Sequence, residues 1–180
     1  MRKVYTSAVA IIPPEKKWDP IQEIRKVHDR QINRWMPHIT LIYPFRPDFE
    51  YLDLEKKFLE ASKQIVSFEI VLTNFKYFNH GHQKYTMWLD PEPSELIVNL
   101  QAELLKIVPD CNDVNNYNYA FTPHLSVGQF NRRKVLEQKM REFQNSWIPI
   151  EYEVKEIYFI CRENSKGSKF HIERSIPLRT

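Results

Sequence analysis

The sequence predicts an α+β fold. Short runs of apolar and β-branched residues alternate with segments whose apolar residues recur at helical spacing. Neighbouring strand-like segments are joined by short polar turns, which favours antiparallel pairs. The same order of elements recurs in the second half of the chain, and no linker separates the halves. We therefore expect a single α+β domain over residues 1–180.

The first half begins with a β-branched run over residues 4–12 that ends at two prolines, as a buried strand would. A helix is expected over 20–34, with Ile21, Ile24 and Val27 at helical spacing. A second helix is expected over 49–66, with its apolar side formed by Leu52, Leu54, Phe58, Leu59 and Ile65. The remaining strands are expected over residues 38–45, 68–78 and 85–89.

The second half repeats this alternation. A helix over 94–108 starts at Ser94 and Glu95, residue types that favour a helix N-terminus. A polar loop over 110–118 is expected to be exposed. It is followed by a strand, a helix and two final strands, over 121–130, 132–145, 151–162 and 170–177.

Composition places the chain among ordinary globular proteins, with 42% hydrophobic residues and a net charge of +3. The mild positive charge is compatible with an anionic ligand. Cys111 and Cys161 are the only cysteines, so we expect a reducing compartment and free thiols. The sequence contains no pattern typical of a signal peptide and no membrane span. We expect a cytoplasmic protein, and a nuclear location is also compatible.

A short pattern occurs twice, 86 residues apart. Proline and histidine are followed by an apolar, a hydroxyl and an apolar residue, in the segments 37–41 and 123–127. Side chains alternate across a strand, so His38 and Thr40 should point to one face, as should His124 and Ser126. One such pattern is common by chance in a structural strand, but two copies with the same flanks indicate a shared site.

Two imidazoles and two hydroxyls around one cleft are suited to phosphoryl chemistry. One neutral histidine can accept a proton from the attacking oxygen, and the other, when protonated, can donate one to the leaving oxygen. The hydroxyls of Thr40 and Ser126 can donate hydrogen bonds to phosphate oxygens. This chemistry requires no cofactor and no metal.

These motifs resemble those of the 2H phosphoesterase superfamily, in particular its 2′-5′ RNA ligase-like and cyclic phosphodiesterase branch. Residues 37–45 are similar to the first family motif, residues 121–128 to the second, and residues 154–162 to the apolar strand that follows it. The resemblance implies two pseudo-symmetric lobes, each an antiparallel sheet backed by helices, with a cleft between them. It implies His38 and His124 as catalytic residues and Thr40 and Ser126 as phosphate-binding residues.

The resulting hypothesis is a metal-independent hydrolase that opens RNA-type 2′,3′-cyclic phosphates or cleaves 2′-linked phosphodiesters during RNA processing. Its partner would be an RNA end or a nucleotide, and we expect a monomer that does not bind membranes. A nucleotide- or RNA-binding module with little turnover, a 2′-5′ RNA ligase and an unrelated α+β scaffold are the alternatives. The choice between acid and base for each histidine, the base specificity and the product stay open.

Other residues carry weaker signals. Tyr43, Tyr158 and Arg162 are candidates for substrate binding, although rim aromatics and solvated charges are the commoner fates of such residues. Lys84 and the basic segment 132–134 could contact phosphates, but solvated surface positions are commoner. A metal site at His80 and His82 lacks partners at ligand spacing, and His28 and His171 are expected to be structural.

Overall fold

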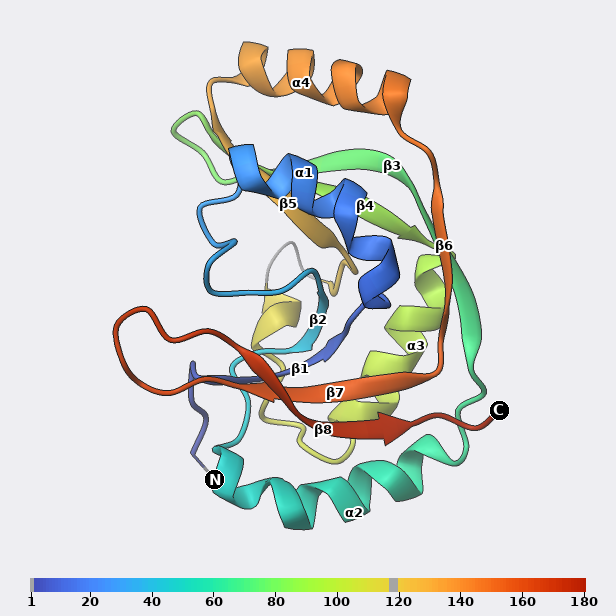
Figure 1. Cartoon of the computed structure of the whole chain (residues 1–180). Coiled ribbons are helices and arrows are strands. Elements are labelled where there is room, and N and C mark those ends of the chain that lie inside the picture. Colours follow the sequence, from blue (N-terminus) through green and yellow to red (C-terminus); the bar gives the residue numbers. More distant parts are fainter. Residues whose placement is uncertain (1, 117–119) are drawn as a thin grey trace.

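Two four-stranded antiparallel sheets form the centre of the protein (Figure 1), in a computed structural model that describes residues 2–116 and 120–180. The first sheet has the order β2 (Ile39–Ile42), β1 (Ser7–Ile11), β7 (Glu156–Cys161) and β8 (His171–Pro177). The second has the order β5 (Leu125–Asn131), β4 (Lys84–Glu92), β3 (Phe68–Asn79) and β6 (Ile150–Val154). The expected α+β fold is confirmed.

Within the described residues, four helices pack against the sheets. They are α1 (Trp18–His28), α2 (Tyr51–Ser62), α3 (Ser94–Leu105) and α4 (Arg133–Ser146), with short 3₁₀ turns η1 (Glu15–Lys17), η2 (Asp48–Glu50) and η3 (Asp113–Asn116). Figure 1 shows α2 and α4 at opposite ends of the molecule, where α2 contacts β8 and α4 contacts the second sheet. Helix α1 follows β1 in the chain but contacts β5 of the other sheet. Elements from each half of the chain therefore contribute to, or pack against, both sheets.

One apolar core runs through both sheets. Val9, Leu41 and Phe159 of the first sheet belong to the same buried cluster as Leu89 and Leu125 of the second. Burial of such side chains is the main favourable contribution to folding, at roughly 1.5–3 kcal/mol each. The two lobes are consequently held together by the core itself.

The helix expected over 20–34 ends earlier, at His28. Asp29 follows it, and its side-chain Oδ1 accepts a hydrogen bond of 2.8 Å from the backbone N–H of Gln31. This local bond replaces the helical one and turns the chain. The apolar faces also differ from expectation, because Val27 of α1 and Leu52 of α2 are 74% and 62% exposed.

The strand expected over 151–162 is two strands in different sheets. Residues up to Val154 pair with β3 in the second sheet, and residues from Glu156 pair with β1 and β8 in the first. Lys155 lies between them, and its carbonyl accepts a hydrogen bond of 2.8 Å from the N–H of Leu178. The alternation of apolar residues breaks at Lys155 and Glu156, but no proline or glycine marks the crossing, so the sequence alone predicted one strand.

The remaining boundaries shift by a few residues. β4 is longer than expected, and the loop expected over 110–118 contains η3, whose residues 113–115 are half-buried rather than exposed. Residues 117 and 118 of that expected loop lie outside the described ranges. Cys111 and Cys161 are free and buried. Within the described ranges, no helix has the length and apolar character needed to cross a membrane.

Candidate active site

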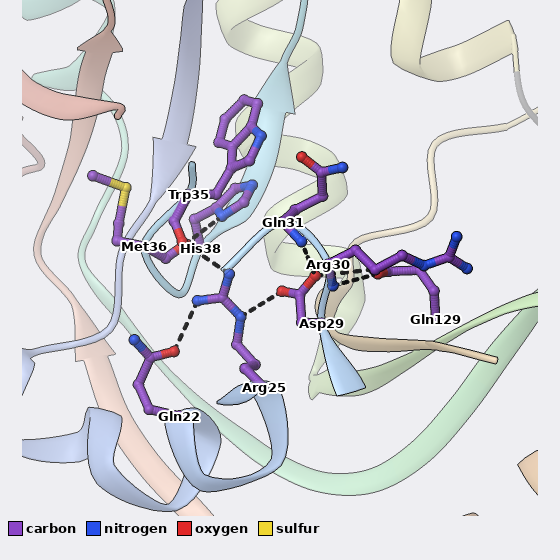
Figure 2. A network of polar contacts seen from close by, with 9 residues as sticks. All are labelled: Gln22, Arg25, Asp29, Arg30, Gln31, Trp35, Met36, His38 and Gln129. Carbon is purple, nitrogen blue, oxygen red and sulfur yellow. Dashed lines mark hydrogen bonds and ion pairs between the residues drawn. The ribbon is translucent and has the colours of Figure 1, made fainter. Parts of the chain in front are cut away.

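The two motif strands are neighbours across the lobes, since β2 and β5 contact one another. Each motif histidine lies one residue before its strand, and each hydroxyl residue lies one residue inside it. Thr40, His124 and Ser126 line a pocket of about 520 Å³. His38 is not among the lining residues. Its ring stacks against the indole of Trp35, as Figure 2 shows.

Both imidazoles are held by the same hydrogen bond. His38 Nδ1 lies 2.7 Å from the carbonyl oxygen of Met36, and His124 Nδ1 lies 2.7 Å from that of Thr122. A carbonyl oxygen only accepts, so each Nδ1 carries the proton in the neutral ring. Each Nε2 is then left with its lone pair, which is the form that accepts a proton.

The surroundings of both rings oppose a positive charge. The pKa of His38 is lowered to about 4, chiefly by burial and in smaller part by the charge of Arg25 and any charge on His124, whereas the hydrogen bond to Met36 acts in the opposite direction. Burial also lowers the pKa of His124. The influence of His124 on His38 places the two rings within electrostatic range of each other. Both are neutral at pH 7 in the free protein.

Aromatic side chains fix the two rings differently. The Trp35 ring stacks on His38 at a centroid distance of 4.6 Å, and it also stacks on Phe170 at 3.7 Å. Phe78 meets His124 edge-on at 4.8 Å and 89°. Such contacts restrict the ring orientations, because aromatic pairs prefer stacked or edge-to-face arrangements.

Strand register identifies the side chains that share the cleft face. Thr40 and Tyr158 are both paired with Ala10, so all three point to one face of the first sheet. Tyr158 is half-buried there, and its hydroxyl donates a 2.6 Å hydrogen bond to Glu156. In the second sheet Ser126 is paired with Trp88. Tyr158 therefore lies on the same sheet face as Thr40, although it does not line the pocket.

Tyr43 and Arg162 lie at the edge of this region. Tyr43 lines the pocket, and its hydroxyl donates to the carbonyl of Tyr5 at 3.2 Å. Burial raises the pKa of Tyr43, whereas the positive charges of Arg162 and Arg34 lower it. Arg162 stands over the ring of Phe170 at 5.6 Å. None of the described lining residues is a carboxylate, which suits an anionic ligand.

A buried polar network holds the segment before the first motif (Figure 2). Arg25 Nε donates to Asp29 at 2.7 Å, and its Nη2 donates to the carbonyl of Trp35 at 2.8 Å. Asp29 also accepts a 3.1 Å hydrogen bond from Gln129 of β5, three residues after Ser126. The network thus joins the strand of the second motif to the loop that carries Trp35.

A reciprocal contact holds the strand of the first motif. Gln101 of α3 is buried, and its Nε2 donates to the carbonyl of Leu41 at 3.0 Å. The same nitrogen donates to Asn115 Oδ1 at 2.7 Å. Each motif strand is therefore anchored by residues from the other half of the chain.

The weaker candidates are distributed as follows. His80 lines the pocket and is 2.9 Å from the hydroxyl of Thr86, but neither it nor His82 belongs to a cluster of three metal-ligand residues in the described ranges. Lys84 and the basic segment 132–134 are exposed and do not line the pocket. His28 stacks on Phe130 at 5.0 Å.

Sequence reasoning missed Trp35, Phe78, Trp88 and the network of Arg25, Asp29 and Gln129. Trp35 stands three residues before His38, which is a local signal that could have been noticed. The positions of Phe78 and Trp88 depend on the register of β3, β4 and β5, for which the sequence offers no comparable signal.

Comparisons with known proteins agree with this architecture. The family model described as the 2′-5′ RNA ligase superfamily matches residues 13–166. A Geobacillus kaustophilus protein named "Putative phosphoesterase GK0864" is 25% identical over 122 residues, or 67% of each chain. A Bacillus licheniformis protein named "Putative phosphoesterase BLi01284/BL02661" is 25% identical over 122 residues, covering 67% of this chain and 69% of its own.

Solved structures show the same fold. E. coli LigT complexed with 3′-AMP has a TM-score of 0.60 and 15% identity, over 99% of this chain and 100% of its own. TT0787 of Thermus thermophilus has a TM-score of 0.62 and 18% identity, over 96% of this chain and 97% of its own. The arrangement of two sheets and flanking helices is therefore the two-lobed fold of LigT.

Proposed function

Since the chain belongs to the 2′-5′ RNA ligase superfamily, that is, to the 2H phosphoesterases, we propose that it is a metal-independent phosphodiesterase for RNA-type 2′,3′-cyclic phosphates or 2′-linked phosphodiesters. The observation that carries the proposal is the matched pair of imidazoles. Both use Nδ1 to bond a backbone carbonyl two residues earlier, and both keep Nε2 for proton transfer. Two imidazoles that share this tautomer and each leave Nε2 available suit a reaction that needs one base and one acid.

In the proposed mechanism, Nε2 of one neutral histidine accepts the proton of the attacking water. The other histidine, protonated at Nε2, donates its proton to the ribose oxygen that leaves. Thr40 and Ser126 donate hydrogen bonds to the non-bridging phosphate oxygens. Water attacks phosphorus directly, so no covalent intermediate with the protein forms.

The acid must gain its proton when substrate binds, because both imidazoles are neutral in the free protein at pH 7. A phosphodiester carries one negative charge, and an opposite charge within a few ångströms favours the charged form of a histidine. We propose that the substrate phosphate raises the pKa of the acid histidine. Protonation of the site would thereby be coupled to occupation by an anion.

The shape and lining of the pocket support a nucleotide as the ligand. About 520 Å³ falls within the usual range for small-molecule sites, and the lining combines Tyr43, Phe78 and Phe121 with neutral polar groups. Aromatic faces can stack on a nucleobase. E. coli LigT has been crystallised with 3′-AMP and with ATP, which supports a nucleotide or an RNA end as the partner of this chain.

The proposed product of a nucleoside 2′,3′-cyclic phosphate is the 2′-phosphate. This choice comes from the resemblance to the 2′-5′ RNA ligase-like branch, in which O3′ leaves. Phosphorus NMR of the product, from a panel of cyclic phosphates and 2′-5′ oligonucleotides, tests it directly. A 3′-phosphate would show that the substrate binds in the reverse orientation.

Histidine variants test the mechanism. His38→Ala and His124→Ala should each lower turnover by about 10²- to 10⁴-fold, the usual contribution of a general acid or base. His82→Ala is the matched control, because His82 is an exposed histidine of the β3–β4 turn that does not line the pocket. Full activity in the double variant of His38 and His124 would refute the proposal. Nucleotide binding without turnover in the unaltered protein would favour a binding module.

A further inference from the structure

A second group of reactive side chains lies on the first sheet, on the face opposite the cleft. Cys161 of β7 is paired directly with His171 of β8, and Glu173 follows two residues later on the same strand. Tyr158 and Ile160 of β7 belong to the cluster on the cleft face, whereas Phe159 and Cys161 belong to the core on the other face. Because side chains alternate along a strand, the group faces away from Thr40 and the two motif histidines.

The distances within this group fit a metal ion. Cys161 Sγ lies 3.6 Å from His171 Nε2, and that nitrogen lies 3.5 Å from Glu173 Oε2. All three ligand atoms lie within 4.8 Å of one another. A tetrahedral zinc ion has bonds of about 2.3 Å to sulfur and about 2.1 Å to nitrogen or oxygen, which separates neighbouring ligand atoms by roughly 3.4–3.6 Å.

Two of the three side chains are exposed to solvent, and Cys161 is buried beside them. The side chains of His171 and Glu173 are 57% and 40% exposed. Arg174 Nη1 lies 3.7 Å from Glu173 Oε1, and Arg174 Nε lies 3.4 Å from Glu55 of α2. Arg174 therefore forms an ion pair with one oxygen of Glu173, and the other oxygen lies beside His171.

We propose that Cys161, His171 and Glu173 bind a zinc ion, with water as the fourth ligand. A thiolate, an imidazole and a carboxylate together favour zinc over magnesium or calcium, which prefer oxygen ligands alone. The Cys161 thiol releases its proton to the solvent when the ion binds. The ion would join the edge strand β8 to β7, and it takes no part in the phosphodiesterase reaction proposed for the cleft.

Zinc titration of the full chain, reduced and freed of metal with EDTA, tests the site. A competing chromogenic chelator should report one ion per chain. Cys161→Ser or His171→Ala should weaken binding at least 100-fold, and Arg174→Ala by about 10- to 100-fold, as expected for the partner of a ligand. Cys111→Ser and His82→Ala are the controls, since neither residue belongs to the group, and both variants should bind zinc unchanged.

Cobalt provides a readout that is independent of affinity. Cobalt bound to the unaltered protein should show the near-ultraviolet absorption of a thiolate ligand, and Cys161→Ser should lose it. His171→Ala and Glu173→Gln alter exposed side chains, so their circular dichroism should match that of the unaltered protein. The proposal would be overturned if the unaltered chain bound no stoichiometric zinc. It would also be overturned if zinc binding were unchanged in both Cys161→Ser and His171→Ala.

Discussion

Replacing His38 by asparagine should change how the stability of the protein depends on pH. Asparagine keeps an N–H donor for the carbonyl of Met36, the partner of His38 Nδ1, but it does not titrate. The pKa of His38 is lowered to about 4 in the folded protein, against about 6.5 in an unfolded chain. Unfolding therefore releases a histidine that binds protons more readily.

The direction and size of the effect follow from linkage. Above pH 6.5 neither state binds a proton at His38, so the residue adds no pH dependence. Below pH 6.5 the unfolded state gains a proton that the folded state refuses, so folding stability falls as the pH falls. The loss attributable to His38 reaches about 2 kcal/mol at pH 5 and about 3 kcal/mol below pH 4, at roughly 1.4 kcal/mol per pKa unit.

Urea unfolding at pH 7.5 and pH 5 measures this loss. The difference in unfolding free energy between the unaltered protein and His38→Asn should shift by about 2 kcal/mol in favour of the variant on going to pH 5. His82→Asn removes an exposed histidine and should track the unaltered protein. Parallel pH curves for the unaltered protein and His38→Asn would refute the reasoning.

Further predictions concern packing, positioning and chemistry. Gly128→Ala should destabilise the fold by about 1–3 kcal/mol in thermal unfolding, because its Cβ would lie 2.6 Å from His28 Cβ; an unchanged midpoint would contradict this. Asp29→Asn should cost about 3–5 kcal/mol in urea unfolding, since it leaves the buried Arg25 without its carboxylate, whereas a neutral effect would show that the pair is dispensable. Prolonged EDTA treatment should leave phosphodiesterase activity intact, whereas loss of activity restored by zinc would argue for a metal in the reaction. The rate should be bell-shaped in pH, and a single-limb profile would exclude an acid and base pair.

The fold class and the motif strands could be predicted because they depend on local order. The alternation of side chains along a strand is a property of any strand, so the spacing of His38 and Thr40 predicted that both residues share one face. In the structure Thr40 lines the pocket and His38 does not. The division of residues 151–162 between two sheets could not be predicted. The first part pairs with β3, about 80 residues away in the sequence, and the second part pairs with β1, more than 140 residues away.

The surroundings of the two motif histidines also depend on long-range contacts that the sequence does not predict. The sequence predicts that two imidazoles and two hydroxyls belong together, but not that Trp35 covers one ring while Phe78 and Trp88 flank the other. These aromatic contacts, together with burial, decide the orientation and the charge state of the rings. The depressed pKa of His38 is a property of that enclosure, which no local pattern encodes.

The reciprocal anchoring of the two lobes explains how two separate motifs can act as one site. Gln101, from the helix after β4, donates a hydrogen bond to the carbonyl of Leu41 in the first motif, and Gln129, from β5, donates one to Asp29 in the loop that leads to this motif. Movement of one lobe relative to the other would therefore break buried hydrogen bonds, and leaving such groups without partners costs about 1–3 kcal/mol each. Proton transfer through hydrogen bonds of about 3 Å tolerates little displacement between acid and base. The shared core and these crossed contacts thus hold Thr40 and Ser126, from different sheets, in the lining of one pocket.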